Sequence, residues 1–304
     1  MIDAVVLIAF GGPTARDEIR PFLANVTRGR RISAERLEEV AHHYEQMPGA
    51  RSPLNDLTLD QAQALGEALA RRGTPTEVRV GMRNWRPYLH EVLGELAGSG
   101  ARRCLGIIMS SLRCEASWDR YLQDVAEARA RTGGVPDVVF APPWGRGRGF
   151  VDALVDRARA ALHTIPAGGR RFTPLVFTAH SIPVAMAAAS PYVDDFTAVA
   201  REVASRLGHP RWSLAYQSRS GRGEDAWLEP DVNTVVRSLA GDGERHAVVV
   251  PAGFVCDHVE VLYDLDVEAV EAARERGLTL HRAATVGNHP AFIESLADLV
   301  VSAE

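Results

Sequence analysis

The sequence predicts an α/β protein built from two similar Rossmann-like lobes, each a parallel sheet flanked by helices. Short apolar runs rich in β-branched residues alternate with segments of helical periodicity along the 304 residues. Most of these runs end in a polar or glycine-containing loop that leads into the next helical segment. The same order of strand, loop and helix recurs in the second half of the chain, so we expect two lobes in series.

The first half opens with a run, Ala4–Phe10, that is apolar throughout and stops at Gly11-Gly12-Pro13. An uninterrupted apolar run is typical of a strand that is buried on both faces of a parallel sheet. Apolar residues at steps of three and four predict a helix over Asp56–Arg72, which Gly73 ends. The other elements expected in this half are a helix at Asp17–Leu23 and strands at Glu77–Gly81 and Cys104–Met109.

The second half contains three further expected strands, Leu175–Ala179, Trp212–Tyr216 and Ala247–Pro251. We place the break between the lobes near Pro142-Pro143, which gives a first lobe of residues 1–142 and a second of residues 143–304. Ligands of open parallel sheets bind outside the carboxyl ends of the strands. We therefore expect an active-site cleft between the two lobes.

The composition is that of an ordinary globular protein, with 46% apolar and 24% charged residues and a net charge of -5. This balance gives no sign of a nucleic-acid partner. No apolar run approaches the roughly 18 residues that span a bilayer, so we expect a cytoplasmic protein without membrane attachment. Its three cysteines, Cys104, Cys114 and Cys256, include no close pair, and we expect neither a disulfide framework nor an iron–sulfur cluster.

His180 is the first candidate for chemistry, because a continuous apolar strand delivers it to the strand's carboxyl end. A neutral imidazole nitrogen binds Fe²⁺, Zn²⁺ or Cu²⁺, and near pH 7 it also accepts protons. Pro183 follows shortly afterwards and prevents further strand pairing. Read by itself, the pattern is equally that of a hydrogen-bonded loop histidine.

A row of carboxylates is the second candidate. Glu260, Asp264 and Glu268 are spaced four residues apart in a segment of helical pattern. On an α-helix this spacing places them on one face, with about 6 Å between neighbours. Such a row suits a divalent cation that prefers oxygen ligands. The alternative reading is a solvated acidic face of the helix.

The two candidate segments resemble the signature pair of the ferrochelatase family, particularly its actinobacterial-type coproporphyrin members. His180 stands in Phe-Thr-Ala-His-Ser-Ile-Pro, and Glu260 stands in Gly-Phe-Val-Cys-Asp-His-Val-Glu-Val-Leu-Tyr-Asp. The resemblance covers nearly the whole chain. Further matching segments, in the family's order, are Phe10–Pro13, Pro21–Arg30, Ser52–Asn55, Arg83–Tyr88, Tyr216–Gly221 and Trp227–Asp231.

This resemblance implies a porphyrin metal chelatase with Fe²⁺ as substrate and no tightly bound cofactor. His180 and Glu260 become the pair that handles the metal and the protons, and Asp264 and Glu268 become further metal ligands on a path for ion entry or proton exit. Insertion of a metal into a porphyrin needs such groups, because two pyrrole protons must leave as the metal arrives. The residues that the resemblance assigns to the porphyrin are Phe10, Arg28, Arg30, Arg51, Ser52 and Leu112.

Three departures from the family pattern lie among these segments. The loop before Ser52 reads Met47-Pro-Gly-Ala-Arg51, where relatives carry a Gly-Gly pair. Leu112 stands where close relatives carry a tyrosine, and it cannot ligate a metal. Cys256 replaces a serine. These changes bear on the choice of porphyrin and on axial ligation more than on the reaction.

We expect coproporphyrin III rather than protoporphyrin IX as the substrate. The stretch Thr14–Arg31 is charged and polar, whereas protoporphyrin members often carry an apolar lip there. Four propionates would suit Arg28, Arg30, Arg31 and Arg51.

We also expect a soluble monomer or weak dimer. Two alternatives stay open, a noncatalytic tetrapyrrole carrier on the same fold and a chelatase for another metal or tetrapyrrole.

Overall fold

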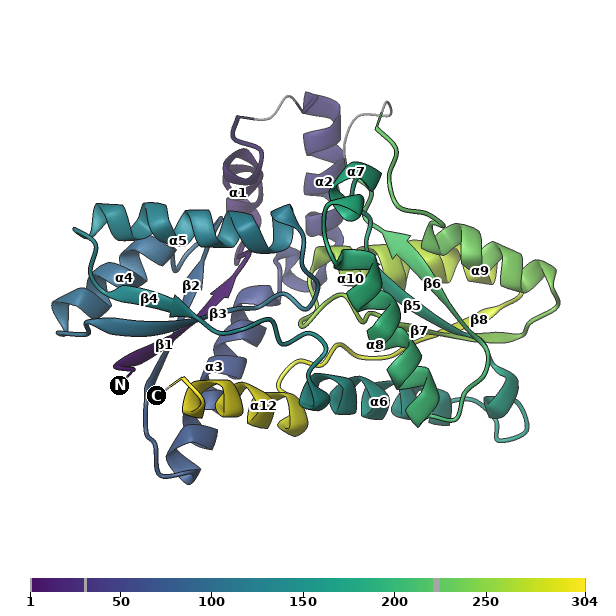
Figure 1. Ribbon diagram of the computed structural model, residues 1–304. Coiled ribbons are helices and arrows are strands. Elements are labelled where there is room, and N and C mark those ends of the chain that lie inside the picture. Colours follow the sequence, from purple (N-terminus) through teal and green to yellow (C-terminus); the bar gives the residue numbers. More distant parts are fainter. Residues whose placement is uncertain (1, 30–31, 221–224, 304) are drawn as a thin grey trace. The chain divides into compact units, whose positions relative to one another are not determined.

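The computed structural model describes residues 2–29, 32–220 and 225–303, and the chain divides into two compact units. Unit 1 comprises Met1–Ser110, Glu115–Trp144 and Gly287–Glu304. Unit 2 comprises Ser111–Cys114 and Gly145–Val286. Figure 1 shows the elements of both units in the colours of the sequence.

The sheet of unit 1 has four parallel strands in the order β2-β1-β3-β4. Their bounds are β1 Ala4–Ala9, β2 Glu77–Met82, β3 Arg103–Ile108 and β4 Asp137–Phe140. All six residues of β1 are buried, as its apolar run predicted, because β1 is central and covered on both faces. One face packs its aliphatic side chains against helices α4 and α5 (Leu89–Gly98 and Arg120–Arg131).

The remaining helices of unit 1 are α1 Ile19–Val26, α2 Ala34–Gln46, α3 Leu54–Arg71 and α12 Pro290–Val301. The predicted helix Asp17–Leu23 begins instead with a 3₁₀ turn, Arg16–Glu18, and continues as α1. The predicted helix Asp56–Arg72 is α3, displaced by only one or two residues at each end. A π-helical segment, Glu115–Asp119, precedes α5.

Unit 2 repeats this arrangement with the strand order β6-β5-β7-β8, all parallel. Its strands are β5 Leu175–His180, β6 Trp212–Gln217, β7 His246–Val250 and β8 Thr279–Arg282. Its helices are α6 Arg148–His163, α7 Val184–Ala188, α8 Tyr192–Arg206, α9 Val232–Gly241, α10 Val259–Tyr263 and α11 Val270–Arg274. The repeated order confirms the prediction of two similar α/β lobes.

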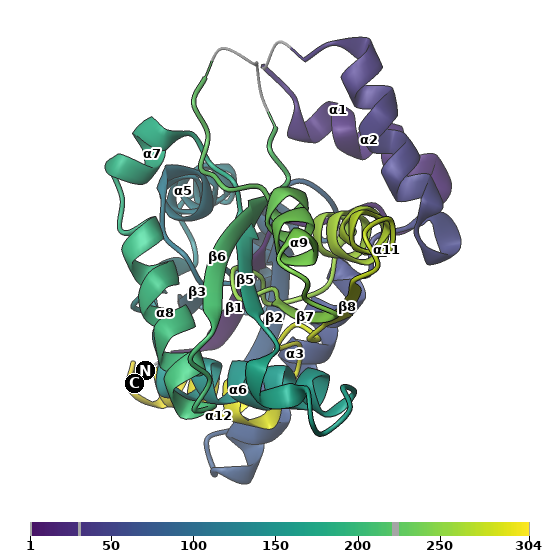
Figure 2. The same cartoon turned by 90° about the vertical axis from the view of Figure 1, so that its right-hand side faces the viewer.

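The helices of unit 2 cover both faces of its sheet (Figure 2). Helices α9, α10 and α11 lie on one face, where Val176, Val236, Val249 and Leu265 belong to a shared apolar core. Helices α6 and α8 pack against each other and against the other face. Central strand β5 is therefore covered on both sides, and only its carboxyl end, at His180, is partly exposed.

The last helix, α12, belongs to unit 1, which differs from the predicted division of the chain at residue 142. The prediction placed residues 143–304 in the second lobe, whereas α12 packs on α3 in unit 1. Arg72 of α3 pairs with Glu294 at 2.6 Å and with Asp298 at 2.7 Å, and Phe292 lies against Trp144 at 5.1 Å between ring centroids. Local periodicity cannot reveal such a return, because the contacts join residues more than 100 positions apart.

No helix in the described part of the chain is long and apolar enough to cross a membrane. The three cysteines are buried and reduced.

We expect Phe292→Ala to lower the free energy of unfolding by about 3–5 kcal/mol, because the side chain is fully buried and its removal leaves a cavity. Urea unfolding followed by fluorescence would measure the loss. Val301→Ala, at an exposed position of the same helix, is the matched control and should change little. Equal effects of the two substitutions would contradict the packing of α12 in unit 1.

Candidate functional site

His180 is held rigidly at the carboxyl end of β5. The hydroxyl of Tyr192, from α8, donates to the His180 carbonyl at 2.9 Å. On the imidazole, Nδ1 is hydrogen-bonded to the carbonyl of Ser181. A carbonyl can only accept, so Nδ1 carries a hydrogen and Nε2 is the nitrogen available to a partner. Nε2 lies 3.5 Å from Oε1 of Glu260, so the structure brings together the two residues predicted as the reaction centre.

The backbone of Glu260 is fixed from two sides at the start of α10. Its N–H donates to the imidazole of His258, the N-cap residue, at 3.2 Å. Its carbonyl accepts a hydrogen bond from the amide of Gln217 at the end of β6. The carboxylate therefore projects from a short helix whose first turn is tied to the sheet, which limits how far it can move from His180.

The pair is stabilised as an ion pair. Burial alone would raise the pKa of Glu260, but the attraction and hydrogen bond of His180 outweigh it and lower this pKa to about 2. Burial would lower the pKa of His180, and the negative charge of Glu260 instead raises it. The side chain of His180 is 27% exposed and that of Glu260 is 38% exposed, so a ligand can reach both.

Asp264 differs from Glu260 in its protonation. Burial, with the charges of Glu260 and Glu268 nearby, raises the pKa of Asp264 to about 7, although Ser218 opposes the shift by donating a hydrogen bond to its carboxylate. Ser218 has a φ of 61°, an unusual backbone conformation for a residue with a side chain. At neutral pH the site therefore holds an ionised carboxylate beside a carboxyl group that exchanges its proton readily.

The backbone that carries the predicted row of carboxylates is not α-helical throughout. Helix α10 ends at Tyr263, and Asp264–Ala269 is π-helical before α11 begins at Val270. A π-helix bonds each residue to the fifth one along, so the regular α-helical face does not continue through Asp264. The structure brings Asp264 close to Glu260, whereas Glu268 is exposed at the outer end of the row.

Within the described ranges, no group of three or more histidine, cysteine, aspartate or glutamate side chains is arranged to hold a metal ion. His180 and Glu260 offer two ligands at most. An ion bound there would therefore keep several coordination positions for water or for an incoming ligand, which suits transfer of the ion better than permanent storage.

The residues predicted to contact a porphyrin from unit 1 differ in accessibility. Phe10 follows β1, is 40% exposed and packs edge-to-face on Phe22. Arg28 is exposed and donates to Asn25 at 2.7 Å. It also lines a cavity of about 270 Å³ at the carboxyl end of β2 together with Arg83 and other polar residues.

The other predicted porphyrin contacts are committed to neighbours or buried. Arg51 pairs with Asp56 at 2.6 Å. Ser52 is 2% exposed, and its hydroxyl accepts from the N–H of Leu54 at 3.3 Å. Leu112 belongs to unit 2 and is buried. Arg30, and Arg31 beside it, lie outside the described residues.

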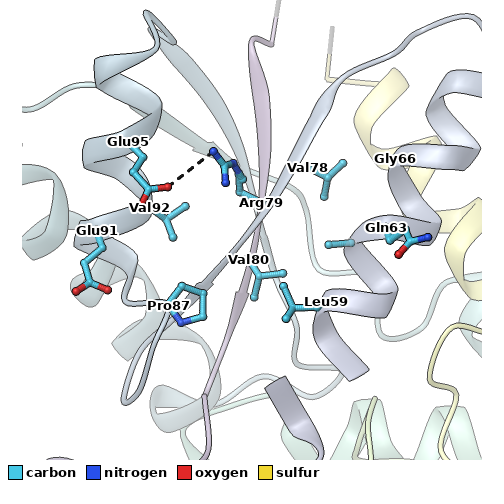
Figure 3. Close-up of a pocket in the computed structure, with 11 residues that line it drawn as sticks. Leu59, Gln63, Gly66, Val78, Arg79, Val80, Pro87, Glu91, Val92 and Glu95 are labelled. Carbon is cyan, nitrogen blue, oxygen red and sulfur yellow. Dashed lines mark ion pairs between the residues drawn. The ribbon is translucent and has the colours of Figure 1, made fainter. Parts of the chain in front are cut away.

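A larger hollow, of about 510 Å³, lies beside edge strand β2 between α3 and α4 (Figure 3). On one side Val80 lies beside Leu59 and Val78 lies near Gly66, and on the other side Arg79 reaches toward Glu95 at 3.8 Å. This hollow contains none of the predicted site residues. Its charged groups are paired at the surface, so it offers no counterpart to the His180–Glu260 arrangement.

Sequence reasoning missed the residues that support the pair, namely Tyr192, Gln217, Ser218 and His258. Gln217 and Ser218 lie just after a predicted strand, in a segment that matches the family, but the match assigned them no role. Their roles depend on hydrogen bonds to residues about 45 positions away, which no local pattern encodes.

Comparisons with known proteins agree on one family. The family model described as Ferrochelatase matches residues 2–304. A coproporphyrin III ferrochelatase from Mycolicibacterium smegmatis is 40% identical over 302 residues, covering 98% of this chain and 88% of the relative. The protein of the same name from Frankia alni is 42% identical over 313 residues, covering 98% and 79%.

Two solved structures show the same fold at low sequence identity. SirB from Bacillus subtilis with Fe³⁺ gives a TM-score of 0.59 at 11% identity and covers 99% of this chain and 95% of its own. CbiX, described as the terminal enzyme of sirohaem biosynthesis in denitrifying bacteria, gives 0.57 at 13% identity and covers 99% of both chains.

The raised pKa of Asp264 has a measurable consequence for stability. Between about pH 4 and pH 7 the folded state holds a proton that an unfolded aspartate, with its ordinary pKa of 3.8, releases. The contribution of Asp264 to stability therefore falls as the pH rises through this range. We expect Asp264→Asn to gain stability relative to the unmodified protein as the pH is raised from about 5 to about 8.

Denaturant unfolding at several pH values would measure this difference. Asp60→Asn, at an exposed position of α3, is the control and should show a difference that does not vary with pH. A pH-independent difference for Asp264→Asn as well would mean that its carboxyl group titrates normally.

Proposed function

Because the chain belongs to the ferrochelatase family and is a porphyrin metal chelatase, we propose that it inserts Fe²⁺ into coproporphyrin III in haem biosynthesis, with His180 and Glu260 as its reaction centre. One observation carries the assignment of the centre. An imidazole at a strand end and a carboxylate at a helix start lie 3.5 Å apart, and both remain accessible. Fe²⁺ is a substrate here, and it leaves the protein within the product.

Insertion of the metal releases two protons, since the porphyrin gives up two pyrrole N–H hydrogens as the ion binds to its four nitrogens. A group that accepts these protons must lie close to the ring centre. Glu260 is ionised at neutral pH and attracts the cation. The approach of a divalent cation disfavours the protonated form of His180 through charge repulsion, which frees Nε2 to bind the metal or to accept a pyrrole proton.

Asp264 and Glu268 extend this centre outward in our proposal. Asp264, with a pKa of about 7, can accept a proton and release it again at the pH of a cell interior. Glu268 is exposed, so it provides the contact between the row and solvent. Together they would supply a route by which water-bound ions enter or protons leave, while Glu260 and His180 act on the porphyrin.

The choice of coproporphyrin III rests on the relatives and on the cations of unit 1. The relatives from M. smegmatis and F. alni are both named coproporphyrin III ferrochelatases. Coproporphyrin III carries four propionates, and the exposed Arg28 lines a polar cavity at the end of β2. Guanidinium groups suit carboxylates in both charge and shape. Cytoplasmic location, a monomeric state and the absence of a tightly bound cofactor remain predictions.

We expect His180→Ala to abolish metal insertion and Glu260→Gln to slow it by about 10²–10⁴-fold, the usual range for a lost acid–base group. Porphyrin binding should be largely kept, because Gln preserves the shape of the glutamate. Absorbance changes of the porphyrin with Fe²⁺, and with Zn²⁺ as a second metal, would measure insertion. Glu268→Gln is the matched control in the same row and should cost less.

Near-normal insertion by His180→Ala with both metals would contradict the assigned centre. Tight porphyrin binding by the unmodified protein without insertion of Fe²⁺, Co²⁺, Ni²⁺ or Zn²⁺ would favour a tetrapyrrole carrier, an alternative consistent with the buried Leu112.

The substrate assignment predicts faster turnover of coproporphyrin III than of protoporphyrin IX under the same conditions. Arg28→Ala should raise KM for coproporphyrin III with a smaller effect on kcat, because the arginine contributes to binding rather than to the chemical step. Arg159→Ala removes an equal charge from the surface of α6 and should change neither constant. Faster turnover of protoporphyrin IX would overturn the choice of substrate.

A further inference from the structure

A pair of histidines lies at the end of the unit 2 sheet opposite to His180. His246 is the first residue of β7, and His281 lies in the adjacent strand β8. The register pairs His246 with Thr279 and Val248 with His281, so both imidazoles stand on the same face of the sheet. This is the face that α6 covers, and Thr164, the C-cap of α6, contacts the pair. The register with β5 places His246 about 23 Å from His180 along the strands.

The hydrogen bonds of this pair fix the direction in which each nitrogen points. The hydroxyl of Thr164 donates to the carbonyl of Ala161 at 2.8 Å, so its oxygen accepts from Nδ1 of His281 at 2.7 Å. Nε2 of His281 is then unprotonated, and its lone pair faces Nδ1 of His246 at 3.1 Å. One shared hydrogen, on His246, lies between the two rings.

A metal ion can take the place of that hydrogen. If the hydrogen of His246 moves to its Nε2, both rings stay neutral, and a rotation of the rings can direct the two lone pairs to one point beside the line that joins the nitrogens. Two imidazole nitrogens bound to a tetrahedral metal at about 2.0–2.1 Å lie about 3.3 Å apart. The observed separation of 3.1 Å thus needs to widen by only a few tenths of an ångström. Burial and the neighbouring His246 lower the pKa of His281, which keeps its ring neutral at physiological pH.

A hydrogen-bond acceptor that orients a metal-binding histidine is present as well as the short distance between the nitrogens. A metal-binding imidazole normally donates its other N–H to a fixed acceptor, which sets its tautomer and orientation. Thr164 is such an acceptor for His281, and it is itself oriented by its bond to Ala161. Both imidazoles are half-buried, so water can complete the coordination.

We propose that His246 and His281 form a second metal site, which binds a divalent transition-metal ion of the imidazole-preferring class, Zn²⁺, Ni²⁺ or Cu²⁺. Oxygen-preferring ions such as Mg²⁺ and Ca²⁺ are not expected there, because both protein ligands are nitrogens. An ion in this site would join β7 to β8 and to α6. It would also bind far from the reaction centre, so it would occupy a different site from the substrate metal.

Isothermal titration of the His180→Ala protein with Zn²⁺ would test the site, because this background removes one ligand from the reaction centre. We expect one binding event to remain. His246→Gln and His281→Gln, each added to this background, should weaken that event at least tenfold, whereas His42→Gln, which removes an exposed histidine of α2, should leave it unchanged. Thr164→Val should weaken binding by about 10–100-fold, as loss of an orienting hydrogen bond usually does.

Two further measurements keep the test decisive if a histidine variant folds poorly. Zn²⁺ should change the ¹⁵N chemical shifts of Nδ1 of His246 and Nε2 of His281 in the His180→Ala protein. It should also raise the Tm of this protein, since an ion that binds only the folded state stabilises it. Ring shifts that do not respond to Zn²⁺, or binding that persists unchanged in both glutamine variants, would overturn the proposal.

Discussion

The ion pair between His180 and Glu260 is the interaction on which the chemistry of unit 2 depends. Nδ1 of His180 is bound to a backbone carbonyl, so Nε2 has to face whatever lies across from it. A half-buried carboxylate at 3.5 Å favours a proton on that nitrogen, and the positive imidazole in turn keeps the carboxylate ionised. Removing either partner leaves the other charge without compensation, which is costly in a desolvated position.

Neighbouring carboxyl groups in this site have widely separated pKa values. Glu260 has a cation as its nearest partner, and its pKa falls to about 2. For Asp264, burial and two neighbouring carboxylates outweigh the hydrogen bond from Ser218, and its pKa rises to about 7. Environments that separate the pKa values of two acids assign them different roles in proton transfer. Ser218 limits the separation, because its hydroxyl stabilises the ionised form of Asp264.

Much of the fold was predictable because it depends on local patterns. The apolar run before His180 could only be a covered strand, and the recurrence of strand and helix predicted two lobes. The errors concern features that local patterns do not record. A residue spacing of four reads as α-helix, and nothing in Glu260–Glu268 reveals that the backbone is π-helical from Asp264. The return of α12 to unit 1 is decided by contacts with residues distant in sequence.

The two units share one architecture but carry different chemistry. Central strands β1 and β5 occupy the same position in sheets of the same order, and in both units a π-helical segment lies in the helical region after the third strand. At the strand ends of unit 1 stand groups suited to binding a flat, carboxylated ligand, an exposed aromatic ring at Phe10 and an exposed guanidinium group at Arg28. At those of unit 2 stand groups that titrate, His180, Glu260 and Asp264. Repetition of the fold thus supplies two similar scaffolds, which differ in the side chains at their strand ends.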